Sequence, residues 1–445
     1  MAHPYFFYRW GTIYGSGQSP IQDNIISFAI QKLLCGPDDD SGRLTLTPHQ
    51  ECAVLSQRLA LDINNTVYIA SGSTTNYDMA YKAQLQIANY MRVCMVIPND
   101  LTAVRGVAAS EPILSEAASH IMRGNYNFNL ANALLNVLDS YAISHGDRGE
   151  LLVAAFFMRA RDLLARQIPV LELFPYNERT ICPIFSVKDL LSNLFQAAHF
   201  NRMLNSFPSV RRADFSLQKF DDVFGRTNMH FNHLIKPFKQ KVLTRPHLVA
   251  MMARGAAALG ANGQFGFDMV YPFLHETRDL AAKKVGFIVV RVENHATYMA
   301  PDADLFRKMD PFHCGLLSKE DRQDFTVPII RIVFALGGGE PSFEHLTHEP
   351  PEEGAATFDR NGQPQFTSYD FWCSGISPGI LKPVDEDNAQ KKWEVLLGKT
   401  DTWGGVFSTS KDPYVRRSQY PAGGIDSAHY DAWVPESHIP RDLLD

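Results

Sequence analysis

The chain has 445 residues, of which 45% are hydrophobic and 20% are charged, and its formal net charge at pH 7 is −6. These proportions are typical of a folded protein, and at about 150 residues per domain the length predicts two or three domains. The acidic balance excludes a chain that is basic throughout, so any nucleic-acid site must be a local patch. No apolar run reaches the roughly 18 residues of a membrane span. The six cysteines form no CxxC pair, so we expect an intracellular protein, nuclear or cytoplasmic, without a membrane partner.

Residues 1–135 are predicted to form a helical N-terminal region. Apolar residues recur at helical spacing in three segments, 21–34, 49–63 and 76–91. A further helix is expected to begin at Ser110-Glu111-Pro112, where a capping serine is followed by an early proline. The region contains no cluster of catalytic residue types, and its helices are a candidate surface for a protein partner.

Residues 136–380 are predicted to form the core, and residues 381–445 an irregular C-terminal extension that packs on it. A strongly apolar helix is expected to follow Gly149, and β-branched and aromatic residues indicate buried strands over 264–273, 285–293, 327–336 and 366–373. The predicted fold class is therefore α/β (α+β), with a mixed central sheet flanked by helices.

Four charged residues of this core occur where charge is costly. Glu150 lies at the start of the apolar helix, and Asp268 lies within a hydrophobic strand. Arg291 and Glu293 lie two residues apart in the strand VGFIVVRVE, so alternation places them on one face of the sheet. Charges in such surroundings must be paired or bound to something. The four are the candidate catalytic residues.

The order of a helix Glu, a strand Asp and a strand with two charges resembles the PD-(D/E)XK nuclease superfamily. The chain looks more closely like a multicopy group of fungal proteins related to Crinkler and retrotransposon-hotspot proteins. The resemblance rests on HGDRGELLVAAFFMRARDLL, ANGQFGFDMVYPF, VGFIVVRVENH and VPIIRIVFALG, taken in order. It implies a restriction-endonuclease-like core in which two acidic strand residues bind Mg²⁺; Asp268 matches the first, and Glu293 is the candidate for the second. A lysine would then activate the attacking water.

The chain departs from that pattern at two positions. Arg291 stands where the resemblance implies an acidic residue or glutamine, and Glu293 stands where it implies the lysine. A fixed positive charge at the metal position disfavours a bound cation. An active enzyme would need a lysine from elsewhere, for which Lys283 and Lys284 are candidates.

A basic segment precedes Asp268. No acidic residue occurs between Val223 and Phe267. The cations singled out there as candidate nucleic-acid contacts are Arg226, Lys236, Lys239, Lys241 and Arg245. Such a segment can contact the phosphate backbone of DNA or RNA.

Three functions remain open from the sequence. The first is a catalytically impaired, nuclease-like protein that binds nucleic acid through residues 226–254. The second is an active, Mg²⁺-dependent nuclease with a rearranged site. The third is a non-enzymatic interaction module that acts through its N-terminal helices.

Overall fold

The computed structural model describes most of the chain up to residue 398. The described residues are 19–36, 45–61, 63–66, 74–96, 103–108, 111–123, 128–140, 148–167, 184–237, 240, 242–261, 263–294, 298, 300–338, 340–347, 364–385 and 389–398. Within them, none of the helices combines the length and the apolar character that a membrane crossing requires.

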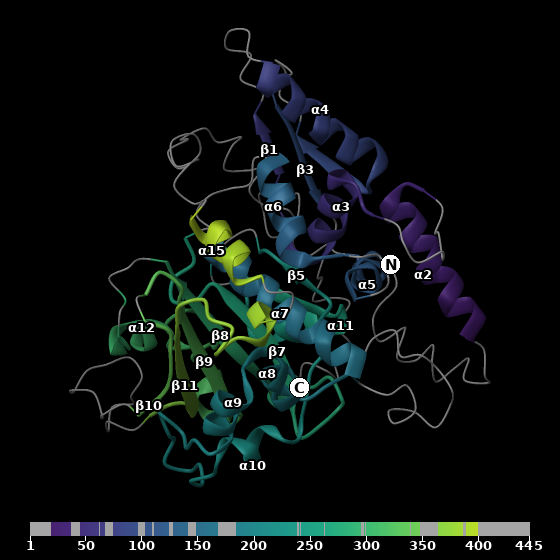
Figure 1. The fold of residues 1–445 in the computed structure, drawn as a ribbon. Helices are drawn as coiled ribbons and strands as arrows, with labels where there is room; N and C mark the ends of the chain where they lie inside the picture. Colours follow the sequence, from purple (N-terminus) through teal and green to yellow (C-terminus); the bar gives the residue numbers. More distant parts are fainter. Residues whose placement is uncertain are drawn as a thin grey trace.

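The N-terminal part contains five described helices and a small sheet. The helices are α2 (Ser19–Leu34), α3 (Pro48–Leu59), α4 (Thr74–Asn89), α5 (Pro112–Arg123) and α6 (Leu130–Ser140). The strands β1 (Ile63–Thr66), β2 (Arg92–Val96) and β3 (Ala103–Ala108) pair antiparallel in the order β1-β3-β2. The small sheet stands beside α4 at the top of Figure 1. The prediction of a mostly helical region missed these strands, because they are short and their apolar residues do not alternate over a long run.

Local sequence explains where α3 begins. The Thr47 hydroxyl accepts a hydrogen bond from the Gln50 backbone, and the Gln50 side chain accepts one from the Thr47 backbone. Pro48 follows in the first turn, where its missing N–H costs nothing. This capping box fixes the start of a helix whose far end carries Arg58 into the interior.

The core is an eight-stranded mixed sheet, which confirms the predicted fold class at that level. Its strands are β4 (Thr227–Asn228), β5 (His233–Ile235), β6 (Ala256–Leu259), β7 (Met269–His275), β8 (Val285–Glu293), β9 (Ile329–Ala335), β10 (Ser342–Leu346) and β11 (Ser368–Ser374). The order is β10-β11-β9-β8-β7-β6-β5, with β4 paired to β7. Strands β6, β7 and β8 form an antiparallel meander, whereas β8, β9 and β11 run parallel. Each of the four predicted strand segments overlaps a strand of this sheet, although β7 and β11 end beyond the predicted bounds.

One face of the sheet is covered by α7 (Arg148–Gln167), α8 (Val187–Leu194), α9 (Ala197–Leu204) and α10 (Phe220–Phe224). Aromatic pairs make this contact, for example Phe157 stacked on Tyr271 at 4.2 Å between ring centroids. Helix α7 crosses the sheet in Figure 1. Because large apolar side chains fill this layer, the face holds no free charged group among the described residues.

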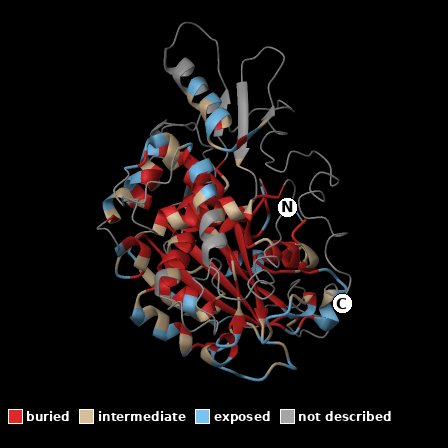
Figure 2. Ribbon diagram, turned by 90° about the vertical axis from the view of Figure 1, so that its right-hand side faces the viewer, coloured by how far each residue is buried: buried red, intermediate tan, exposed pale blue. Residues whose placement is uncertain are grey.

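The opposite face is covered by α11 (Arg245–Ala253), η1 (Ala282–Lys284), α12 (Ala303–Lys308) and α13 (Asp321–Asp324). Phe287 of β8 stacks on Phe325, which follows α13, at 5.9 Å. Figure 2 shows buried residues concentrated in the large sheet and in the sides of the helices that face it. This layering leaves the ends of the strands as the places where charged side chains can gather.

The described part of the C-terminal extension packs on the core. It consists of α14 (Lys382–Asp385) and α15 (Gln390–Gly398). Trp393 of α15 meets Phe156 of α7 edge to face at 4.9 Å. One hydrophobic cluster includes residues from α2 to α15 and crosses the boundary predicted between residues 135 and 136. The remainder of the predicted extension, 399–445, lies outside the described residues.

Candidate functional site

The candidate catalytic residues gather where β8 ends and β7 begins. The antiparallel register sets Met269 opposite Val290, so Asp268 comes opposite Arg291. The Asp268 backbone N–H donates to the Val290 carbonyl at 2.8 Å. Strand alternation puts Arg291 and Glu293 on the face that Asp268 also occupies. A shift of one residue in the β7–β8 register would take Asp268 away from Arg291 and Glu293.

Arg291 bridges the two strand carboxylates. Its Nη1 donates to Asp268 Oδ1 at 3.1 Å, and its Nε donates to Glu293 Oε1 at 3.0 Å. The side chains of Asp268 and Glu293 are 9% and 11% exposed, and that of Arg291 is 28% exposed. The Val292 backbone N–H also donates to Asp268 Oδ2, at 2.6 Å. The carboxylates are thus buried and oriented, and the guanidinium covers them from the solvent side.

Glu150 joins this cluster from the start of α7. A Cβ atom added to Gly149 would lie 2.1 Å from Asn294 Oδ1, so the first turn of α7 abuts the residue that follows β8. The half-buried Glu150 interacts electrostatically with Arg291. The sequence order of Glu150, Asp268, Arg291 and Glu293 therefore becomes one three-dimensional cluster.

The pKa of Arg291 is raised above its ordinary value. Burial works against its charge, but Asp268, Glu293 and Glu150 outweigh that cost. A guanidinium so stabilised stays charged at any pH at which the protein is folded. The cluster therefore carries its own permanent cation.

This arrangement does not fit a divalent metal ion. Among the residues that the structure describes, no three His, Cys, Asp or Glu side chains form a group that could hold one. The guanidinium lies between Asp268 and Glu293, the two candidate metal ligands. Its fixed charge would repel a second cation there.

The two lysines considered as replacements lie far away. Lys283 and Lys284 are exposed in η1, before the first residue of β8, whereas the cluster lies at the last residues of that strand. At the rise of about 3.3 Å per residue of a β-strand, Lys284 and Glu293 are about 30 Å apart along the chain. Neither lysine can serve this cluster.

The basic segment 226–254 offers less surface charge than its sequence suggests. Arg226 is exposed, but Lys236 and Arg245 are each only 5% exposed. Arg245 is held by Asp321 at 2.7 Å and by the Ala282 carbonyl at 2.6 Å. Arg245 is thus a structural residue, and the expectation that Lys236 and Arg245 present their charges to a ligand is wrong, because the fold buries both. Lys239 and Lys241 lie outside the described residues.

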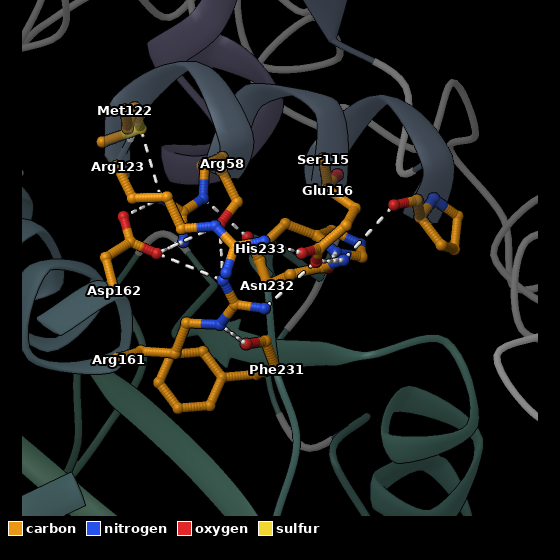
Figure 3. A network of polar contacts seen from close by, with 12 residues as sticks. Arg58, Ser115, Glu116, Met122, Arg123, Arg161, Asp162, Phe231, Asn232 and His233 are labelled. Atoms are coloured by element: carbon orange, nitrogen blue, oxygen red, sulfur yellow. Dashed lines mark hydrogen bonds and ion pairs between the residues drawn. The ribbon is translucent and has the colours of Figure 1, made fainter. Parts of the chain in front are cut away.

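A second polar cluster, which the sequence did not reveal, joins the N-terminal helices to the core. Asp162 of α7 accepts hydrogen bonds from Arg58 of α3 at 2.5 and 2.9 Å. Arg161 donates to Glu116 of α5 at 3.0 Å and to the Phe231 carbonyl at 3.1 Å. Figure 3 shows these side chains converging from three helices on the segment that leads into β5. We call this set (Arg58, Glu116, Arg161, Asp162 and Asn232) the interlayer network.

The interlayer network is structural. Its two arginines are fully buried, and each carboxylate is about 1% exposed. Burial opposes the charge of both acids, but the arginines dominate and lower the pKa of Glu116 and of Asp162 to about 2. With no exposed reactive atom, the network cannot meet a substrate. The charged stretch RARD inside an apolar helix was the one signal in the sequence.

A third pair was also missed. Arg331 of β9 lies directly opposite Asp370 of β11 in the parallel register, and two hydrogen bonds of 2.7 and 2.5 Å join them. The side chain of Arg331 is 2% exposed and that of Asp370 is 0% exposed. The Arg331 guanidinium lies over the rings of Phe306 and Phe366. Each residue is a lone charge in an apolar strand, which indicates pairing but not the partner.

Of the three clusters, only the one around Arg291 combines an exposed charge with buried, oriented carboxylates. It can hold charge in fixed positions and contact a polar ligand at the guanidinium, but it lacks a lysine and a free cation position. Comparisons of the chain with protein-family models, with curated proteins and with solved structures found no match.

Proposed function

We propose that the protein is a nuclease-like protein whose cleavage site is blocked by its own arginine and which binds nucleic acid without cutting it. The observation that carries the proposal is the Arg291 bridge between Asp268 and Glu293, with Glu150 beside it. Glu150 and Asp268 match the resemblance in residue type and order, whereas Arg291 and Glu293 depart from it. The guanidinium supplies the positive charge that a metal would otherwise supply.

Electrostatics support an inactive site over a rearranged active one. Phosphodiester cleavage requires positive charge on the scissile phosphate and an activated water. The described cluster has one cation, and both carboxylates already engage it. An active enzyme would require Arg291 to leave, exposing Asp268 and Glu293 to Mg²⁺.

The test is a cleavage assay with single- and double-stranded DNA and RNA in Mg²⁺ or Mn²⁺. We expect that neither the wild type nor the Asp268→Ala control cleaves any of these nucleic acids. Wild-type cleavage that is lost in Asp268→Ala would overturn the blocked site and establish the active alternative.

A gain of function tests the alignment itself. The double variant Arg291→Glu with Glu293→Lys restores the charge order that the resemblance implies. We expect metal-dependent cleavage from this variant and none from either single variant. If the folded double variant is inert with every nucleic acid and both metals, the nuclease-like assignment of the cluster fails.

A second candidate function is supported by the surface of the N-terminal part. Four of the eight large apolar side chains that are exposed among the described residues lie there: Phe28 at 59%, Tyr81 at 52%, Met91 at 45% and Val93 at 43%. Exposed apolar side chains are typical of protein interfaces. A protein partner on this part is compatible with a blocked cleavage site. Loss of a pulled-down partner on Tyr81→Ser with Val93→Ser would support it, and retention would exclude this surface.

A further inference from the structure

A closed loop between α9 and α10 displays apolar and basic side chains together. The loop spans residues 206–220, and the Phe220 backbone N–H donates to the Ser206 carbonyl at 2.9 Å across its neck. Lys219 Nζ donates to Asn205 Oδ1 at 3.2 Å at the same place. A compact loop of this length with joined ends is an Ω-loop, a type that is frequently functional.

The Ω-loop is anchored along its whole length. Val210 exchanges backbone hydrogen bonds with Ser368 at the start of β11, at 2.9 and 3.3 Å. The Tyr369 hydroxyl donates to the Gln218 carbonyl at 2.9 Å. Arg212 is paired with Asp214 and also donates to the Phe325 carbonyl at 2.9 Å. The loop backbone is therefore preorganised, so a ligand would not have to order it.

Two apolar side chains of the Ω-loop nevertheless face solvent. Phe207 is 41% exposed and Leu217 is 63% exposed, whereas Phe215 between them packs partly on the core. Phe207 adjoins Ser206 in the neck, and Leu217 precedes Lys219 by two residues. Because the anchored backbone holds both side chains outward, they are available to a ligand.

Cations outnumber acids among the exposed charges around these side chains. Residues 196–220 contain four lysines and arginines and a single acid, Asp214, which is committed to Arg212. Arg202, Arg211 and Lys219 are exposed, and none of them forms an ion pair within the part of the chain that the structure describes. In the helix that follows, Asp221 is paired with Lys188, whereas Asp222 is exposed and acts electrostatically on Tyr369, which bonds to the loop. Three exposed cations, Arg202, Arg211 and Lys219, thus outnumber one exposed acid, and this excess complements an anionic ligand with apolar faces.

We propose that the Ω-loop, with Arg202, binds single-stranded nucleic acid. Phosphates would contact Arg202, Arg211 and Lys219, and unstacked bases would pack on Phe207 and Leu217. Cations that contact phosphates, together with an aromatic side chain on which a base stacks, are how single strands are held without sequence preference; Phe207 is that aromatic side chain, and Leu217 adds apolar contact. The choice of nucleic acid over an acidic peptide rests on the proposed function, whereas the location rests on the loop itself.

The probe is a fluorescein-labelled oligothymidylate of about 15 nucleotides, in the range that one such surface covers. Fluorescence anisotropy gives Kd over a salt series, with a duplex of equal length as comparison. We expect single strands to bind more tightly than the duplex, because bases in a duplex cannot reach Phe207 and Leu217.

Matched variants locate the surface. Phe207→Ala should weaken binding roughly tenfold through lost stacking. Phe28→Ala, at a phenylalanine of α2 that is more exposed than Phe207, should leave Kd unchanged. Lys219→Glu should weaken binding and lower the slope of log K against log salt by about 0.7 or more. Lys391→Glu, on the exposed side of α15, is its control. All four positions are exposed, so thermal melts should remain at the wild-type temperature.

The outcomes separate the two proposals. If the wild type binds the oligonucleotide and the Ω-loop variants bind it equally well, this surface is wrong and nucleic-acid binding stands. If the wild type binds neither single strands nor duplex, the Ω-loop assignment and the binding half of the proposed function both fail, and the cleavage-site assays decide the rest. If an acidic peptide binds instead and Phe207→Ala abolishes that binding, the ligand class is wrong and the location is right.

Discussion

At the level of single residues, Arg291 sets the electrostatics of the carboxylate cluster. Alternation along β8 puts Arg291 and Glu293 on one face, and the register between β7 and β8 puts Asp268 beside them. A neutral side chain at position 291 would leave two carboxylates close together and nearly buried, each without its counter-charge. Arg291 is therefore both the stabilising partner of the cluster and the obstacle to a metal ion.

Arg291→Ala should lower the free energy of unfolding by about 2 kcal/mol. This lies below the usual 3–5 kcal/mol for breaking a buried pair, since the Arg291 side chain is more than a quarter exposed. Added Mg²⁺ should then raise the melting temperature of the variant but not that of the wild type, because a ligand stabilises only a protein that binds it. Differential scanning calorimetry with and without Mg²⁺ measures both effects.

The control is Arg291→Ala combined with Asp268→Asn, which removes one of the two carboxylates that would bind Mg²⁺. Mg²⁺ should not stabilise this double variant. Equal responses to Mg²⁺ in the wild type, the single variant and the double variant would show that Arg291 does not occupy a cation position.

At the level of elements, buried charges fix the pairing of the parallel strands. Arg331 and Asp370 are the only charged residues of strands β9 and β11, and they lie opposite each other in the register. A slip of one residue between β9 and β11 would place Arg331 on one face of the sheet and Asp370 on the other. The pair therefore specifies a register that the apolar residues alone would specify weakly.

Asp370→Ala should destabilise the fold by about 3–5 kcal/mol, because it leaves Arg331 charged and buried. The double variant Arg331→Met with Asp370→Leu should be more stable than the single variant, since no unpaired charge remains. Urea denaturation of the three proteins gives the comparison. A double variant less stable than Asp370→Ala would contradict this account of the pair.

At the level of the whole molecule, the interlayer network makes the N-terminal helices part of the core. Arg58 on α3 bonds to Asp162 of α7 and to the Asn232 carbonyl before β5, and Glu116 on α5 bonds to Arg161 of α7. Removing the N-terminal helices would take Arg58 from Asp162 and Glu116 from Arg161, in a region that would no longer exclude water. The two parts should therefore unfold together, whatever partner the N-terminal surface binds.

Stability should fall on acidification in two stages. Burial lowers the pKa of His233 to about 3 in the folded protein, whereas in the unfolded chain the pKa is near 6.5. Between these two values only the unfolded chain protonates His233, so the free energy of unfolding falls as the pH is lowered through this range. The pKa values of Glu116 and Asp162 are lowered to about 2, so their contribution is complete above their unfolded values near 4 and is lost as pH falls towards 2. The slope should approach about 1.4 kcal/mol per pH unit for each proton. Urea denaturation between pH 7 and pH 3 measures it.

His233→Gln provides the matched comparison. The variant should show a shallower loss of stability between pH 6.5 and 4.5 than the wild type and the same steep loss below that range. Arg58, Arg254 and His230 oppose a charge on His233, so they act with burial in the same direction. An unchanged upper slope in the variant would mean that His233 does not stay neutral in the fold.

The sequence by itself determined which segments are buried. Apolar, β-branched runs predicted the four principal strands, and the apolar run of residues 151–158 predicted α7, since periodicity and burial are properties of a local segment. Alternation along β8 also placed Arg291 and Glu293 on one face. The short strands β1, β2 and β3 carried no such pattern and were missed.

Only the tertiary structure decided which charges meet and which reach solvent. Lys236 and Arg245 look like surface cations in the sequence, but packing buries both and pairs Arg245 with Asp321. Phe207 and Leu217 look like core residues, but the anchored Ω-loop holds them outward. The partners of Arg58, Arg331 and Asp162 come from other elements, because pairing across a fold depends on register and packing that no local pattern encodes. The cluster at Arg291 shows both contributions: alternation aligned its two strand charges, and the β7–β8 register and the start of α7 supplied the rest.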